Sequence, residues 1–181
     1  MNKFYDNKHK SEIKKIEELW ENLNDLATMA KSYGIDDIFQ DNGAKILQQL
    51  VYLNFDILAG REGNDAVSAS GTEWEMKSVN IELTSGFSTN HHTNHFIISK
   101  YRKVPWSFAI YKGIQLQEIY VMSPKQLEPI YQHWEEQLNA DSSKTHLNNP
   151  KIPVKYVRAN GIKVYPINKE APIDPDLVVE H

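Results

Sequence analysis

The sequence contains no cysteine, and this absence removes two classes of structure at once. Neither a disulfide bond nor a thiolate metal site can form, which fits a protein of a reducing compartment such as the cytoplasm. A long apolar run is also missing, so no segment resembles a signal peptide or a membrane span. We therefore expect a soluble, cytoplasmic protein, and its 181 residues suit one domain with a sizeable core.

Positive charge is scarce over the whole chain, whose formal net charge is −4. Because phosphate binding rewards lysine and arginine, this total argues at first against a nucleic-acid partner. The distribution reverses that argument, since residues 86–165 contain ten Lys/Arg and only five Asp/Glu. Residues 1–85 contain nine Lys/Arg and fifteen Asp/Glu. A basic second half beside an acidic first half is compatible with DNA binding.

Two acids and a lysine form a candidate catalytic set: Asp65, then Glu75 and Lys77 after a nine-residue gap. Carboxylates are the hard oxygen ligands that Mg²⁺ prefers, and Mg²⁺ polarises a phosphate oxygen and lowers the pKa of a bound water. The run from Glu73 to Lys77 alternates polar and apolar residues, so Glu73, Glu75 and Lys77 share one face of a strand. Lys77 can there orient the water or stabilise the pentavalent phosphorus. The alternative is a solvated Glu75–Lys77 pair on an edge strand.

Helical and strand-like patterns alternate along the chain and predict an α/β fold. Ser11 is expected to cap a first helix that stops at Gly34, and Asp41 to cap a second helix through Leu53. Strands carrying the candidate acids are expected from about residue 64 to 83.

The second half of the chain has clearer signals for where its elements begin and turn. Residues 106–112 and 115–122 predict a hairpin that turns at Gly113. Ser123-Pro124-Lys125-Gln126 predicts a capping box that opens a helix. Asn160-Gly161 predicts a last hairpin between residues 154–158 and 162–165. The tail, residues 166–181, is rich in proline and acids and is expected to be flexible.

Five blocks of the sequence together carry a resemblance to a known family: residues 34–43, 60–78, 86–89, 100–106 and 148–156. In this order they resemble type II restriction endonucleases of the PvuII type, within the PD-(D/E)xK nuclease superfamily. The resemblance runs from about Trp20 to Tyr165. Asn64 departs from the general superfamily motif, which has proline before the first acid.

The resemblance implies a restriction-endonuclease-like core, with a mixed central β-sheet flanked by helices. It implies a single nuclease domain over residues 1–165, whose N-terminal helical region (about 1–40) forms a homodimer interface. The implied reaction is Mg²⁺-dependent hydrolysis of double-stranded DNA at the palindrome CAGCTG, which leaves blunt ends with a 5′-phosphate. Two-fold symmetry in such a dimer matches the palindrome. The enzyme would defend the cell against foreign DNA, with a cognate DNA methyltransferase as its functional partner.

The resemblance also assigns roles to individual residues. Asp65, Glu75 and Lys77 would be catalytic, with Asp65 and Glu75 as metal ligands. The major groove would be lined by Ser88, His91, His92, Asn148 and Asn149, where histidine can donate to guanine and asparagine can pair with adenine. Asp41 would approach the minor groove near the dimer axis, and Glu62 and Tyr101 would lie near the active site. An ordinary structural role is the alternative for each of these last three residues. Asn90 stands where the family has the first of three histidines.

Other interpretations of the same residues remain open. His91, His92 and His95 could hold zinc, but adjacent histidines on a strand point to opposite faces and no nearby acid completes a tetrahedral set. A DNA-binding protein on the same scaffold could be catalytically silent or differently specific, although the intact Asp-Glu-Lys set argues against silence. A repair nuclease that reads DNA shape would not need the asparagine and histidine readers. A hydrolase of small phosphate esters has only the acidic total charge in its favour.

Overall fold

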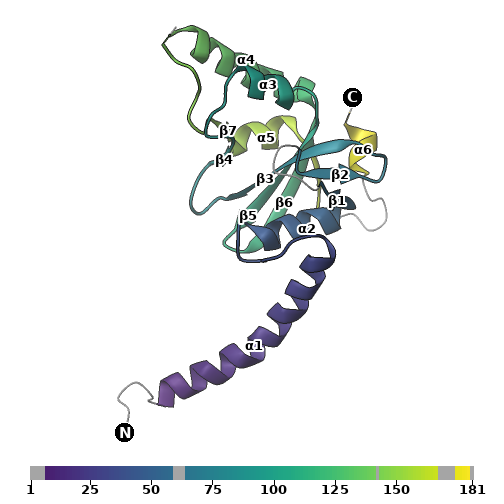
Figure 1. Cartoon of the computed structure of the whole chain (residues 1–181), viewed down its shortest axis with the longest axis vertical. Helices are drawn as coiled ribbons and strands as arrows, with labels where there is room; N and C mark the ends of the chain where they lie inside the picture. The colour runs from purple at the N-terminus through teal and green to yellow at the C-terminus, as the bar shows by residue number, and fades with distance from the viewer. Residues whose placement is uncertain (1–6, 59–63, 142, 167–173, 180–181) are drawn as a thin grey trace. The chain divides into compact units, whose positions relative to one another are not determined.

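Two helices make up most of the N-terminal part of the chain in this computed structural model, which describes residues 7–58, 64–141, 143–166 and 174–179. α1 spans Asn7–Ser32 and α2 spans Gly43–Leu53 (Figure 1). α1 ends in a Schellman motif: Gly34 has φ +78°, its N–H donates to the Lys31 carbonyl, and the Ile35 N–H donates to the Ala30 carbonyl. The predicted stop at Gly34 is therefore confirmed.

The predicted starts of both helices are wrong. α1 begins at Asn7, ahead of Ser11, because the polar run before Ser11 contains no glycine or proline to stop a helix. Asp41 does not stand at the start of α2, because Asp41 and Asn42 form a left-handed turn with φ +47° and +64°. The helix begins at Gly43, where a Cβ would clash with the Asp37 carbonyl oxygen. Only glycine fits this close approach.

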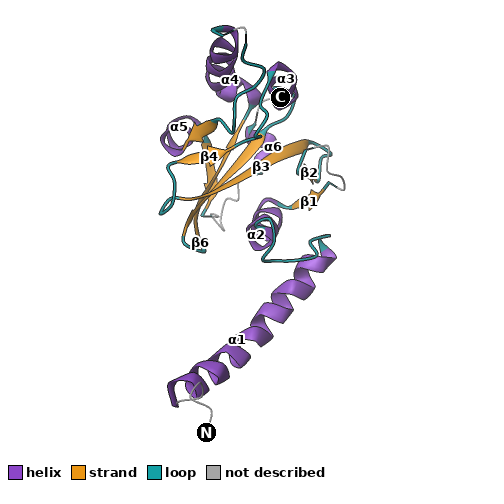
Figure 2. Ribbon diagram, turned by 60° about the vertical axis from the view of Figure 1, so that its left-hand side comes forward, coloured by secondary structure: helices purple, strands orange, loops and turns teal. Residues whose placement is uncertain are grey.

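A mixed sheet of six strands forms the framework of the C-terminal part, in the order β1-β2-β3-β5-β6-β8 (Figure 2). Its strands are β1 Phe55–Ile57, β2 Ala66–Ser68, β3 Glu73–Asn80, β5 Trp106–Lys112, β6 Gln115–Met122 and β8 Ile162–Tyr165. β3 and β5 are parallel, and the other neighbouring strands are antiparallel. β4 Gly86–Ser88 and β7 Lys151–Pro153 form a separate two-stranded sheet. The predicted β5–β6 hairpin and the predicted α/β class, with a mixed central sheet flanked by helices, are confirmed.

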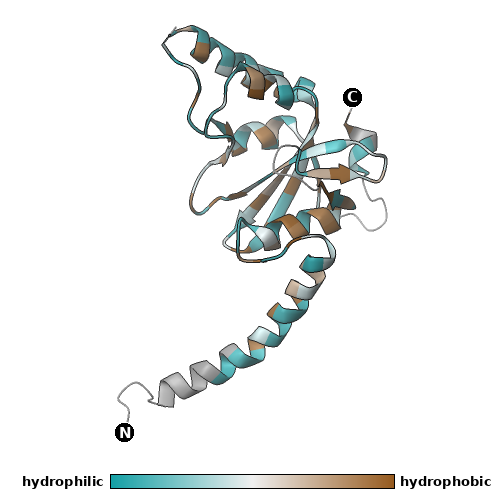
Figure 3. Cartoon of the chain, in the orientation of Figure 1, coloured by the Kyte–Doolittle hydropathy of each residue, from teal (hydrophilic) through white to brown (hydrophobic). Residues whose placement is uncertain are grey.

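The main apolar core lies on one face of this sheet. Trp106 and Phe108 of β5 are fully buried there, and the Trp106 ring packs against Tyr131 at 6.4 Å between centroids. The helices on this face are α3 His95–Tyr101, α4 Pro124–Asn139 and α5 Val154–Asn160. Strands β5 and β6 contain many hydrophobic residues, whereas the coloured part of α1 consists mostly of hydrophilic residues (Figure 3). On the opposite face, the buried Ser107 hydroxyl donates to Gln49 in α2 at 3.2 Å.

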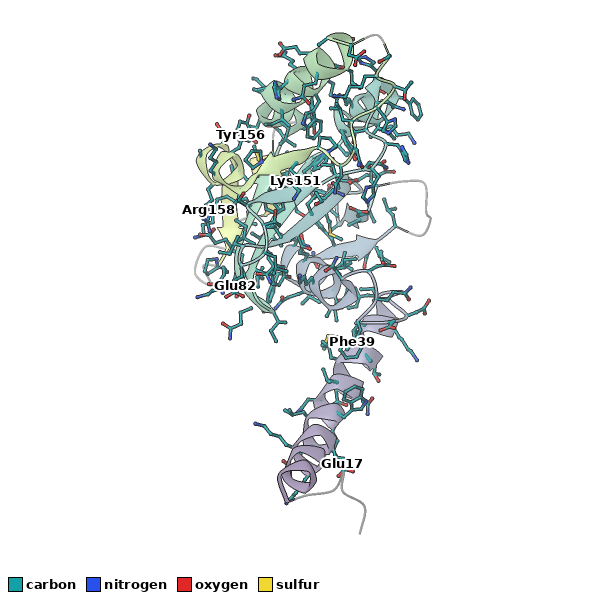
Figure 4. The ribbon with its side chains drawn as sticks, turned by 90° about the vertical axis from the view of Figure 1, so that its left-hand side faces the viewer. Glu17, Phe39, Glu82, Lys151, Tyr156 and Arg158 are labelled. Carbon is teal, nitrogen blue, oxygen red and sulfur yellow. The ribbon has the colours of Figure 1, made fainter. Side chains whose placement is uncertain are left out.

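α4 begins as the sequence predicts. The Ser123 side chain accepts from the Gln126 N–H, the Gln126 side chain accepts from the Ser123 N–H, and Pro124 occupies the first turn. The predicted last hairpin is wrong, because residues 154–160 form helix α5 and β8 pairs with β6 instead. Val154 and Val157 are the buried residues of α5, at helical spacing. The exposed side of α5 includes Arg158, which Figure 4 labels beside Tyr156.

The chain divides into two compact units, Met1–Gln48 and Gln49–His181. Part of the tail expected to be flexible, residues 167–173 and 180–181, lies outside the described residues. The described part contains a short helix, α6, over Pro175–Val178, whose N-cap Asp174 accepts from the Asp176 N–H. Among the described helices, none combines the length and apolarity needed to cross a membrane.

Candidate active site

Asp65 stands where β2 separates from β3. Ala66 and Trp74 are paired across the two strands, and beyond them the Asp65 N–H donates to the Trp74 carbonyl at 3.0 Å. The Asp65 carboxylate, through Oδ2, accepts from the Met76 N–H at 2.8 Å. The carboxylate thus replaces a missing strand neighbour and satisfies a backbone donor of β3. This bond fixes one acid beside the strand that carries the other.

Asn64 helps to hold this turn. Its side-chain N–H donates to Glu73 Oε2 at 2.6 Å. A proline at this position could not make such a bond, because its side chain has no donor. Asn64 therefore adds a hydrogen bond between the turn before Asp65 and Glu73, the first residue of β3.

Glu75 and Lys77 are neighbours on one face of β3, as the alternation predicts. Lys77 Nζ donates to Glu75 Oε1 at 2.5 Å, and the two side chains are only 20% and 10% exposed. The Lys77 ammonium also lies 5.6 Å from the centroid of the Trp106 ring, within range of a cation–π attraction. The alternative of a solvated pair on an edge strand is wrong, because both side chains are mostly buried and β3 lies between β2 and β5.

The charges of this cluster act on one another. Burial raises the pKa of Glu75; the Lys77 ammonium lowers it and the Asp65 carboxylate raises it, with a net rise. Burial lowers the pKa of Lys77, but the carboxylates of Glu75 and Asp65 raise it by more. Because the Asp65 carboxylate disfavours ionisation of Glu75, a divalent cation bound beside both carboxylates would relieve this repulsion. Asp65 and Glu75 therefore fit Mg²⁺, which binds through one or two carboxylates and retains waters.

Tyr101 joins the cluster from the end of α3. Burial, partly offset by the Lys77 ammonium, raises the pKa of Tyr101 to about 12. Its ring meets the Trp106 ring edge-on at 4.6 Å between centroids, and its carbonyl accepts from the Tyr131 hydroxyl at 3.3 Å. The phenol is thus a neutral group held beside the buried Glu75–Lys77 pair.

Arg102, the residue after Tyr101, fastens α3 to α4. Its guanidinium donates two bonds to Glu128, at 2.8 and 2.9 Å, and two to Glu135, at 2.6 and 2.7 Å. Such forked pairs are stronger and better oriented than single ion pairs. The bonds from Arg102 hold the pKa of Glu135 below its ordinary value of 4.5. This cluster fixes the helix end that carries Tyr101.

Replacing Arg102 with alanine should lower the free energy of unfolding by about 1–2 kcal/mol at neutral pH. The lowered pKa of Glu135 means that this stability is present above pH 4.5 and is lost as the pH falls through the pKa in the folded state. Urea unfolding of the wild type and of Arg102→Ala, at neutral pH and at a pH well below 4.5, checks this prediction. Arg158→Ala is the control. Arg158 pairs with Glu118 but is 43% exposed, so its loss should matter less. A pH-independent difference would contradict the Arg102–Glu135 assignment.

The expected DNA-reading residues come from two loops that lie side by side. Thr93 and Leu147 form an antiparallel bridge between the loops, and the Thr89 N–H donates to Asn149 Oδ1 at 2.9 Å. His91 Nδ1 lies 3.3 Å from Asn148 Oδ1. Ser88, exposed in β4, pairs with Lys151 of β7 directly after the second loop. The structure therefore brings together Ser88, His91, His92, Asn148 and Asn149, which are far apart in the sequence.

His146 belongs to the same pair of loops, and sequence reasoning missed it. Its ring meets the His92 ring edge-on at 4.7 Å between centroids. The only signal in the sequence was that His146 lies two residues before Asn148. The bridge that brings the two loops together is a tertiary feature, which the sequence does not reveal. His95 is not part of this group, since it begins α3 and lies 3.8 Å from Glu135. No group of three or more His, Cys, Asp or Glu within the described residues is placed to hold a metal ion.

The roles expected of the two remaining candidates stay predictions. Asp41 is exposed in the left-handed turn of the N-terminal unit. Glu62 lies outside the described residues.

One comparison with known families bears on all of these residues. The family model described as restriction endonuclease PvuII matches residues 11–165 of the chain. The matched segment contains the Asp65–Glu75–Lys77 cluster and both loops. It ends at the last residue of β8, before α6.

Proposed function

The chain belongs to the restriction endonuclease PvuII family, and from this premise we propose that it is a Mg²⁺-dependent type II enzyme that cuts DNA at CAGCTG. Membership makes it a DNA-cleaving hydrolase of a restriction system. The observation that carries the finer proposal is the cluster that Glu75 and Lys77 of β3 form with Asp65, which directly precedes β2. Its Glu75–Lys77 bond of 2.5 Å lies largely out of solvent.

The residues of the cluster divide the work of phosphodiester hydrolysis. Asp65 and Glu75 would hold Mg²⁺, which when bound would polarise the scissile phosphate and favour deprotonation of the attacking water. Lys77 would orient that water for in-line attack and stabilise the negative charge on the oxygens of the pentavalent phosphorus. Tyr101 would lie near the scissile phosphate, and Glu62 would contribute indirectly. The products would be a 5′-phosphate and a 3′-hydroxyl at a blunt end.

The two paired loops support the specificity. Exposed His91 and His92 can donate to guanine, and an asparagine amide can form two bonds with adenine in the major groove. Asn149 has φ +50°, which presents its side chain from a left-handed position while Oδ1 accepts from Thr89. A guanine reader and an adenine reader on bridged loops suit the central bases of CAGCTG. Ser88 would contribute at the same groove, and Asp41 would approach the minor groove.

A homodimer would let each subunit cut one strand of the palindrome. Apolar residues of the N-terminal unit support an interface there, because Leu19, Trp20 and Met29 of α1 are each about half exposed. Trp20 also stacks on Phe39, which is 66% exposed. Exposed apolar groups gathered on one segment are typical of interaction surfaces. The cell, with the enzyme in its cytoplasm, would protect its own DNA through a methyltransferase that modifies the same site.

Digestion of plasmid DNA with sequencing of the ends tests this function. With Mg²⁺ we expect discrete blunt cuts at CAGCTG in both strands, and sedimentation of the same protein at micromolar concentration should show a dimer. Ca²⁺ should support binding without cutting, because it is larger and tolerates looser geometry. Discrete cuts elsewhere would overturn the recognition sequence but keep the endonuclease. Binding without cutting in Mg²⁺ would identify a catalytically silent DNA-binding protein.

A further inference from the structure

The end of the chain contacts the strand that carries the candidate catalytic residues. The family match ends at residue 165, and α6 follows it. Asp176 of α6 accepts a hydrogen bond from Trp74 Nε1–H in β3, with 3.2 Å between Asp176 Oδ1 and the nitrogen. Val179, just after α6, is only 2% exposed. α6 therefore packs against the β2–β3 part of the sheet (Figures 1 and 2).

Trp74 links this contact to both candidate metal ligands. It directly precedes Glu75, so its side chain lies on the opposite face of β3. There it is fully buried, and its ring packs on Phe55 with 5.0 Å between centroids. Its backbone carbonyl accepts the hydrogen bond from the Asp65 N–H. One residue thus meets Asp176 with its side chain and Asp65 with its backbone.

Asp65 is joined to β3 through few contacts. The β2–β3 ladder joins only Ala66 to Trp74 and Val67 to Glu73. Past this short ladder, Asp65 is held to β3 by its bonds to the Trp74 carbonyl and the Met76 N–H, while on its other side its carbonyl accepts from the Leu58 N–H. A small movement of Trp74 would therefore change the separation of the Asp65 and Glu75 carboxylates. A displacement of about 1 Å in a catalytic group can cost about 100-fold in rate.

We propose that α6 is an intramolecular strap and that Asp176 is a positioning residue for DNA cleavage. By holding the Trp74 indole, Asp176 keeps β3 and the Asp65 turn at the separation that a divalent cation requires. This proposal rests on the proposed function, since it concerns the geometry of the metal-binding carboxylates. Asp176 does not itself touch the substrate, because it lies on the face of the sheet opposite to Glu75.

Variants of the full-length chain test the strap. Asp176→Ala removes the acceptor, Asp176→Asn keeps an acceptor oxygen, and Trp74→Phe keeps a ring but removes the donor. We expect Asp176→Ala and Trp74→Phe each to lower the cleavage rate about 10- to 100-fold and to raise the Mg²⁺ concentration at half-maximal rate. Both variants should also bind Ca²⁺ more weakly than wild type in a calorimetric titration, in which no cleavage takes place. Asp176→Asn should stay within about 3-fold of wild type, and the Asp176→Ala/Trp74→Phe double variant should be no worse than the poorer single variant. Glu136→Ala, which removes an exposed acid from α4, is the charge control.

The Mg²⁺ dependence separates positioning from general destabilisation. Variants that remain folded at the assay temperature, but lose rate without a change in the Mg²⁺ requirement, would overturn the proposal. Wild-type rates for Asp176→Ala would also overturn it, and a faster variant would show that α6 inhibits the enzyme. Wild-type protein that cleaves no DNA would refute the proposed function and the strap with it, whereas unaffected variants of a cleaving enzyme would refute the strap alone.

Discussion

Replacing Lys77 with alanine should reduce the rate of DNA cleavage by about 1,000-fold or more while specific binding in Ca²⁺ stays largely intact. Removing one group that stabilises developing charge or transfers a proton costs about 100- to 10,000-fold. Lys77 is positioned for either role, because its ammonium is held between the Glu75 carboxylate and the Trp106 ring. Single-turnover cleavage of a duplex containing CAGCTG measures the loss.

Lys112→Ala is the matched control for Lys77. This variant removes the same charge from the last residue of β5, which is exposed. It should leave the cleavage rate near that of wild type. Lys77→Met preserves length without charge and tests whether the loss follows from packing, so it should be as slow as the alanine variant. Unfolding midpoints show whether either variant stays folded. Retained turnover in Lys77→Ala would refute its catalytic role, and an equal loss of binding would identify Lys77 as a DNA-binding residue instead.

Replacing Asn149 with aspartate should lower the preference for CAGCTG over a scrambled duplex by about 100- to 10,000-fold. One asparagine–adenine pair is worth about 1–3 kcal/mol, and a dimer on a palindrome would lose two of them. The aspartate can still adopt the left-handed φ of +50° and still accept from the Thr89 N–H, so the loop should survive. It cannot donate to adenine, because an ionised carboxylate carries no hydrogen.

Comparing the affinity for the CAGCTG duplex with that for the scrambled duplex separates base recognition from the effect of the added charge. An added negative charge near phosphates weakens binding to both duplexes, so it cancels in their ratio. Titration of each duplex in Ca²⁺ at one salt concentration measures that ratio. Asn149→Ala should lose the same preference but also destabilise the loop, since alanine is strained at a left-handed φ. An unchanged ratio in Asn149→Asp would exclude Asn149 as the adenine reader.

The sequence by itself determined the features that depend on neighbours along the chain. The Ser123 capping box, the Gly34 helix stop and the β5–β6 hairpin follow local rules of backbone geometry, and all three appear as predicted. The sequence also predicts that the Glu75 and Lys77 side chains lie on the same face of the strand, because side-chain direction alternates with a period of two. The order of matching blocks was enough to identify the family and its fold.

Tertiary structure decided the features that depend on distant partners. Residues 154–160 satisfy both strand and helix patterns, and burial of Val154 and Val157 selects the helix. The sequence placed Asp65 near β3, but only the separation of β2 from β3 gives its carboxylate the Met76 N–H. His146 joins His92, and Asp176 reaches Trp74, through contacts between segments far apart in the sequence. No local periodicity encodes such contacts, because they depend on how the loops, the sheet and the chain end pack in three dimensions.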